Sequence, residues 1–274
     1  MKYLFFGTPD FAAVILEKLV KAGLPPSFVV CNSDKPVGRK HIITPPSTKL
    51  LAIKYNIPIL QPEVLSNLKF KIQNLKFDVF IIAAYAKIIP KEILELPRLG
   101  VIGVHPSLLP KYRGSSPIQS VILNGEQETG VTLFLADEKV DHGAIVSSIK
   151  YQVSSNDNYE FLNKKLAELG AELLIETLPK FLKGEIVPLI QDETQASYTK
   201  KFIAENGYVN LQKDEPNAIE RKIRALNPEP GVYTFMDIKF EKKRVKLLEA
   251  ELVDGKLKLT RIQVEGGKPQ NVAI

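Results

Sequence analysis

Short apolar runs alternate with amphipathic segments along residues 1–190. Continuous apolar runs of this length are typical of strands buried on both faces, and they cover residues 2–6, 28–31, 57–60, 77–83 and 101–104. Apolar residues recur at helical spacing in 11–22 and 158–182, and a further helix is expected over 47–55. Two later runs, 129–136 and 145–153, are expected to be strands that pair. This order predicts an α/β fold, a Rossmann-like and mostly parallel sheet with helices on both faces.

The pattern changes after residue 188. Residues 188–206 are polar and irregular and are expected to be a linker. A helix over 218–226 and short strands over 232–235, 238–240, 244–251 and 256–264 then predict a small β domain of barrel type. The predicted organisation is a domain over 1–190, a linker over 191–204 and a carboxyl-terminal domain over 205–274.

Residues 32–48 interrupt the first domain. Pro36, Gly38 and two further prolines predict a loop, which also carries Lys35, Arg39 and Lys40. A loop of this length is usually functional or disordered.

Composition narrows the class of protein. The 274 residues are 45% hydrophobic and 25% charged, as in globular proteins. The net charge of +6 mildly favours an anionic partner such as RNA, although many basic proteins simply carry solvated lysines. One cysteine and three histidines without ligand spacing predict no zinc site. The sequence has no run of about 18 apolar residues, so no membrane-spanning helix is expected. The start of the chain lacks signal-peptide features, so we expect a cytoplasmic protein.

Two residues are candidates for acid–base chemistry. His105 follows the strand 101–104, at the strand end where α/β sheets bind ligands, and imidazole changes charge near neutral pH. Asp141, in the sequence KVDHG, could support a charged imidazole. The alternative is that His105 hydrogen-bonds locally in a turn and that Asp141 merely begins one. Spacing along the chain does not show whether the two side chains meet.

Several motifs together resemble one family. They are FFGTPDFA, SDKPVGRK, SLLPKYRGSSPIQ, VDHGAI, IQDETQASYTKK and RALNPEPGVYT. In this order they resemble the folate-dependent formyltransferases, in particular the branch that acts on charged tRNA. GxGxxG, the dinucleotide fingerprint, is absent, so an NAD-dependent oxidoreductase is not expected.

The resemblance implies a reaction and its partners. The formyl group of 10-formyltetrahydrofolate would pass to the α-amine of initiator methionyl-tRNA, without a metal, on a protein expected to be a monomer. The carboxyl-terminal domain would be OB-like and help to hold tRNA. The residues implied are catalytic His105 and Asp141, folate-contacting Ser107, Leu108, Leu109, Pro110, Ala84, Tyr85, Ala86, Lys87 and Ile88, and tRNA-contacting Lys35, Arg39 and Lys40.

Gly103 departs from the family pattern, which carries an asparagine two residues before the histidine. That amide is the second hydrogen-bond donor to the reaction's oxyanion, and loss of one such donor typically costs about 10²–10³ in turnover. Water could fill the space, the chain could be a weakened or inactive variant, or a rearranged loop could offer a backbone N–H. We expect weak but measurable activity, raised by Gly103→Asn.

Two other functions stay open at this stage. A sugar-nucleotide N-formyltransferase would share His105, Asp141 and SLLP, although the basic loop and the second domain count against it. A non-catalytic folate- or RNA-binding descendant is suggested only by Gly103.

Overall fold

The computed structural model describes residues 1–38, 41–238 and 240–272, which form two compact units. The first unit comprises 1–113, 129–151 and 163–198, and the second comprises 114–128, 152–162 and 199–274. The first unit therefore includes most of the segment expected to be a linker, and the second takes two stretches from the expected first domain.

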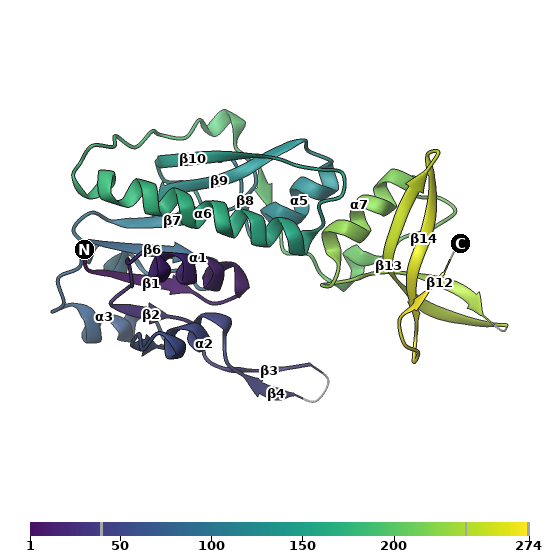
Figure 1. Cartoon of the computed structure of the whole chain (residues 1–274), viewed down its shortest axis with the longest axis horizontal. Coiled ribbons are helices and arrows are strands. Elements are labelled where there is room, and N and C mark those ends of the chain that lie inside the picture. The colour runs from purple at the N-terminus through teal and green to yellow at the C-terminus, as the bar shows by residue number, and fades with distance from the viewer. Residues whose placement is uncertain (39–40, 239, 273–274) are drawn as a thin grey trace. The chain divides into compact units, whose positions relative to one another are not determined.

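A seven-stranded sheet forms the centre of the first unit, in the order β10-β9-β7-β6-β1-β2-β5 (Figure 1). Its strands are β1 (Tyr3–Gly7), β2 (Phe28–Val30), β5 (Ile59–Leu60), β6 (Val79–Ala83), β7 (Val101–His105), β9 (Glu128–Leu135) and β10 (Ile145–Gln152). The neighbours from β7 to β5 run parallel, whereas β9 runs antiparallel to β7. The mostly parallel sheet predicted from the apolar runs is confirmed.

Helices cover both faces of this sheet. They are α1 (Asp10–Lys21), α2 (Ser47–Lys54), α3 (Ser66–Ile72), α4 (Lys91–Leu94) and most of α6 (Tyr159–Leu182). On one face α6 lies so close that a Cβ on Gly170 would be 3.0 Å from Val104 Cγ1 (Figure 1). On the other face, α3 and α4 bury apolar side chains against Phe80 and Val101. Successive residues of a strand point to opposite faces, so Gly103 and His105 share the face of Val101.

Residues 32–48 contain a β-hairpin, so the prediction that the whole segment is a loop was wrong. Strands β3 (Lys35–Val37) and β4 (Ile42–Thr44) pair antiparallel, with Lys35 opposite Thr44. The prolines and glycine that signalled a loop are compatible with a two-stranded ribbon, because its outer edges need no ladder hydrogen bonds. Arg39 and Lys40 lie outside the described residues.

Residues 188–198 are attached to the first unit. Leu189 pairs with Ile145, and the amide of Arg113 donates to the Ser197 carbonyl at 2.8 Å. Short elements continue the segment: a 3₁₀ turn at Glu193–Gln195, strand β11 (Tyr198–Thr199) beside β8 (Arg113–Gly114), and a second 3₁₀ turn at Ala204–Gly207. The polar composition that indicated a linker reflects side chains with partners in the first unit.

The second unit is built on an antiparallel sheet in the order β12-β13-β14-β15. The strands are β12 (Val232–Ile238), β13 (Glu241–Val253), β14 (Lys256–Val264) and β15 (Gln270–Asn271), and helices α5 (Pro117–Asn124) and α7 (Pro216–Leu226) pack against each other. The small β domain is confirmed, while its closure into a barrel stays a prediction. Within the part of the chain described, no helix combines the length and the apolar character needed to cross a membrane.

Phe80 tests the packing of the first unit. Its side chain is fully buried, with ring centroids 5.6 Å from Phe6 and 5.3 Å from Phe77. Phe80→Ala should lower the free energy of unfolding by about 3–5 kcal/mol, measured by urea denaturation, because it leaves a cavity. Phe70→Ala is the control, since Phe70 on α3 is 74% exposed; its expected change is within about 0.5 kcal/mol. Equal losses in the two variants would contradict this packing.

Candidate active site

His105 is the last residue of β7, not a residue beyond the strand as expected. Its side chain is 6% exposed, and each ring nitrogen faces an oxygen. Nε2 lies 2.8 Å from the Tyr112 carbonyl oxygen, and Nδ1 lies 3.4 Å from Asp141 Oδ2. A carbonyl oxygen can only accept, so Nε2 carries a hydrogen. A protonated ring would donate to both oxygens.

Asp141 reaches this histidine from a turn between β9 and β10. Its backbone has φ 50°, in the left-handed region, which aspartate tolerates better than most residues. The carboxylate is 19% exposed, so one side of the pair is open to solvent while the ring is buried. The structure thus answers what spacing could not show: the two candidate side chains meet.

The segment after β7 folds back so that Tyr112 can accept the histidine's hydrogen. Thr132 Oγ1 on β9 donates to the Ser107 carbonyl at 2.7 Å and accepts from the Leu109 amide at 3.1 Å. Ser107 Oγ donates to the Lys111 carbonyl at 2.6 Å, so this hydroxyl is used inside the loop. Tyr112 then takes φ 61°, a costly conformation for a bulky residue, and turns its carbonyl to His105.

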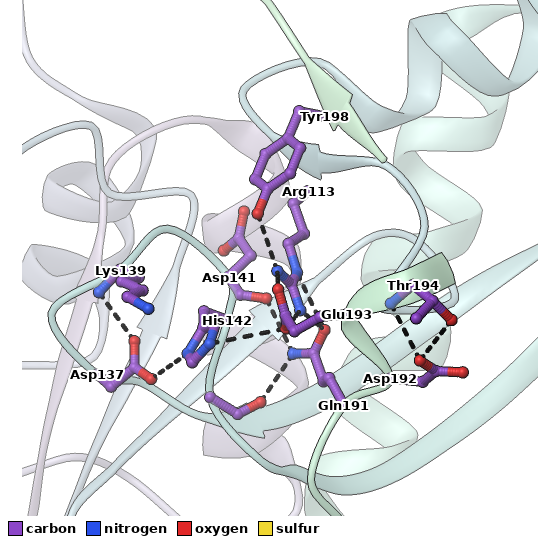
Figure 2. A network of polar contacts seen from close by, with 11 residues as sticks. Arg113, Asp137, Lys139, Asp141, His142, Gln191, Asp192, Glu193, Thr194 and Tyr198 are labelled. Atoms are coloured by element: carbon purple, nitrogen blue, oxygen red, sulfur yellow. Dashed lines mark hydrogen bonds and ion pairs between the residues drawn. The ribbon is translucent and has the colours of Figure 1, made fainter. Parts of the chain in front are cut away.

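Arg113 is fully buried beside this loop and makes five side-chain hydrogen bonds (Figure 2). Nε and Nη2 donate to Gln191 Oε1 at 3.1 and 2.7 Å, both Nη atoms donate to the Glu193 carboxylate, and Nη1 also donates to the Tyr198 hydroxyl at 3.0 Å. A guanidinium has five N–H groups, so this burial leaves none without an acceptor. The hydrogen bonds from Arg113 lower the pKa of the Glu193 carboxyl.

Gln191 links Arg113 to the aspartate turn (Figure 2). Its Nε2 donates to the Asp141 carbonyl at 2.9 Å and to the Gly143 carbonyl at 2.7 Å. The glutamine is buried, so each of these donations replaces a hydrogen bond to water. Sequence reasoning missed Arg113 and Gln191. Each lies in a motif that carries the family resemblance, Arg113 in SLLPKYRGSSPIQ and Gln191 in IQDETQASYTKK, and this was the usable signal.

His142, next to Asp141, belongs to the edge of this network. Its Nδ1 lies 2.6 Å from Asp137 Oδ2 and its Nε2 lies 3.6 Å from Glu193 Oε1 (Figure 2). Both ring nitrogens of His142 thus face carboxylates other than that of Asp141.

The segment Ala84–Ile88 follows β6, the parallel neighbour of β7, at the same edge of the sheet. The Tyr85 hydroxyl is buried and has no hydrogen-bond partner among the described residues, and burial raises its pKa to about 12. Ile88 is 86% exposed, while Lys87 Nζ is used by the carbonyls of Pro62 and Glu63. The Tyr85 ring packs toward β1, with its centroid 5.6 Å from that of Phe6. Exposed apolar surface at this edge of the sheet is a feature of a ligand site.

Gly103, two residues before His105, lies under an aromatic ring. A Cβ at this position would overlap the Cε1 and Cζ atoms of Phe134. The ring of Phe134 therefore takes the position of a Cβ at residue 103. That water supplies the missing donor stays a hypothesis.

The remaining candidates are less informative. Lys35 is exposed in the β3–β4 hairpin. Cys31 is fully buried, and burial raises the pKa of its thiol to about 11, as suits a small core residue. Across residues 1–38, 41–238 and 240–272, no three His, Cys, Asp or Glu side chains gather as metal ligands would.

Comparison with known proteins bears on this geometry. A formyl transferase family model matches residues 1–178, and a model of the formyl transferase carboxyl-terminal domain matches 201–260. The methionyl-tRNA formyltransferase of Staphylococcus aureus (strain MW2) is 42% identical over 255 residues, which cover 92% of this chain and 80% of that protein.

Solved structures share the fold at lower identity. An N-formyltransferase from Helicobacter canadensis, in complex with folinic acid and dTDP-3-aminofucose, aligns over 100% of both chains with a TM-score of 0.69 and 20% identity. HypX from Aquifex aeolicus, in complex with tetrahydrofolic acid, aligns over 99% of this chain and 46% of its own with a TM-score of 0.66 and 18% identity. With the family models and the Staphylococcus relative, these findings show that the chain belongs to the formyl transferase family, on the branch of the methionyl-tRNA formyltransferases.

Proposed function

We propose that this chain transfers the formyl group of 10-formyltetrahydrofolate to the α-amine of methionine on initiator tRNA. The observation that carries the proposal is the pair of His105 and Asp141, 3.4 Å apart at the carboxyl end of β7. One group can donate a proton and the other can accept one, which is what amide formation between an amine and a formyl donor requires.

The two ring nitrogens have different roles in this mechanism. Nε2 donates its hydrogen to the Tyr112 carbonyl and is not available to the substrate. Nδ1 faces the partly exposed carboxylate of Asp141 and is the nitrogen that serves the reaction. As the amine attacks the formyl carbon, the carbonyl oxygen becomes an oxyanion and accepts a hydrogen bond from Nδ1–H. Asp141 takes the proton that the amine loses, directly or through water.

Collapse of the tetrahedral intermediate completes the transfer. The bond from the formyl carbon to folate N10 breaks, and N10 leaves with a proton from His105. The ring is then neutral and Asp141 is protonated, so one proton passed from Asp141 to His105 restores the starting state. The 3.4 Å between Nδ1 and Oδ2 makes that return a single short step.

The family relation supports a folate donor, and the chain's own residues agree with one. The Ser107–Pro110 loop and the Ala84–Ile88 segment follow the neighbouring strands β7 and β6 at the same edge of the sheet, and Ile88 is exposed there. We further propose that Lys35, Arg39 and Lys40 contact tRNA phosphates. An aminoacylated tRNA substrate favours a cytoplasmic enzyme, and one chain supplies both members of the pair, so a monomer suffices.

The central test compares acceptors. The wild-type chain should formylate charged initiator tRNA in preference to charged elongator tRNA and to an amino sugar nucleotide. His105→Ala should lower kcat by about 10²-fold or more, because general acid catalysis contributes about 10²–10⁴. Asp141→Asn should cause a comparable loss, whereas Asp137→Asn, a matched change of an aspartate that faces His142, should not. Formylation of the sugar alone, or folate binding without any transfer, would contradict the proposed function.

Gln191 should act through Asp141. Gln191→Leu removes both donations to the aspartate turn and the oxygen that accepts from Arg113, so kcat should fall by about tenfold or more, because small misplacements of reacting groups are costly. The KM for charged tRNA should stay the same. Gln195→Leu is the matched control, since Gln195 is exposed and bonds only to Asp192 among the described residues. An equal effect of both substitutions would argue against this positioning role.

The basic hairpin can be tested through salt. If Lys35 and Arg39 contact phosphates, Lys35→Ala and Arg39→Ala should each weaken tRNA binding and make the plot of log K against log[salt] shallower by about 1. Lys164→Ala, on the exposed side of α6, provides the comparison. Unchanged slopes in both hairpin variants would show that the hairpin does not touch the nucleic acid.

A further inference from the structure

Gly103 and Phe134 face each other across the antiparallel pair of β7 and β9, one step from the partners His105 and Thr132. Residues directly opposite in a sheet point to the same face, and so do residues two apart on one strand. The glycine, the phenylalanine and the catalytic histidine therefore share one face of the sheet. Phe134 is diagonal to His105, within the reach of an aromatic side chain.

The ring of Phe134 occupies the place of a side chain at position 103. A Cβ on Gly103 would overlap ring atoms Cε1 and Cζ and lie 3.1 Å from Cδ1. Phe134 is 5% exposed and lies in the core, so its ring cannot swing aside as a flexible surface side chain would. Glycine is tolerated within this strand because an aromatic partner covers it.

We propose that Gly103 and Phe134 act as one unit of the active site. The phenyl ring of Phe134 forms the apolar wall beside His105, in the place that a side chain at position 103 would otherwise occupy. This inference rests on the proposed function. The wall keeps water from this side of the imidazole, and electrostatic interactions such as that between His105 and Asp141 are stronger where water is excluded. Phe134 is thus a positioning residue, and the oxyanion receives no amide donor from position 103.

One consequence reverses the expectation drawn from the family pattern. Gly103→Asn alone should lower turnover, not raise it, because the new side chain must displace a buried ring. Phe134→Leu removes the atoms Cε1 and Cζ and keeps an apolar side chain, so it makes room where the new Cβ would overlap the ring. The two positions should therefore be interdependent.

A double-mutant cycle tests the unit by stability and by kinetics. Gly103→Ala should lower the thermal midpoint by about 4 °C or more, and kcat by about tenfold or more. Adding Phe134→Leu should recover at least half of each loss, a non-additivity expected of residues in contact. The double variant Gly103→Asn, Phe134→Leu should likewise have a kcat about tenfold higher than that of the single variant Gly103→Asn. Additive losses in the double variants, or a Gly103→Ala variant as stable and active as the wild type, would overturn the inference.

A second comparison separates the wall from ordinary packing. Phe134→Leu alone should lower kcat about threefold to tenfold without changing the KM for charged tRNA, because the change lies beside the reacting groups. Phe77→Leu alters a buried phenylalanine ahead of β6, at the opposite end of the sheet, and should lower the thermal midpoint without lowering kcat. Equal kcat values for these two variants would overturn the role beside His105. Should the wild-type chain transfer no formyl group, the proposed function fails, and the thermal cycle alone still decides whether the two positions are coupled.

Discussion

The imidazole of His105 is held by two oxygens that arrive from separate parts of the chain. The Tyr112 carbonyl comes from the loop that follows β7, and the Asp141 carboxylate comes from the turn between β9 and β10. Neither contact orients the ring alone, because a carbonyl leaves rotation about one hydrogen bond and a carboxylate at 3.4 Å is a loose partner. Together they define which nitrogen faces the carboxylate, and with it which nitrogen can serve the reaction.

Arg113 explains how both oxygens are kept in place. Burial of a guanidinium costs folding free energy unless every N–H has an acceptor. The residues that accept from Arg113 are therefore fixed in position in the first unit. One of them, Gln191, passes the constraint to the carbonyl of Asp141, while Tyr112 is the residue immediately before the arginine. The polar segment around residues 191–198 is therefore part of the support of the site. Removal of any one acceptor would leave a buried donor unpaired, at a cost of about 1–3 kcal/mol or more.

Periodicity along the chain was sufficient for the parallel sheet, because strands buried on both faces are continuous apolar runs whatever their partners. It was insufficient for β3 and β4, because this exposed hairpin buries no face that would produce an apolar pattern. It was also insufficient for residues 188–198, because their partners, such as Ile145 for Leu189, are distant in sequence. The candidate pair followed from residue type and strand position, but the meeting of His105 with Asp141 required coordinates. Gly103 shows the same limit: the sequence records a missing side chain, whereas only the packing reveals the ring that replaces it.

The hydrogen on His105 Nε2 is the most direct test of this account. Long-range proton–nitrogen NMR spectra of histidine-labelled protein, with His105→Ala to assign the signals, report which ring nitrogen is protonated. The account predicts that Nε2 carries a hydrogen in the free protein at every pH at which the chain is folded, because the Tyr112 carbonyl can only accept. A neutral ring with its hydrogen on Nδ1 and a bare Nε2 would contradict the arrangement on which the mechanism depends.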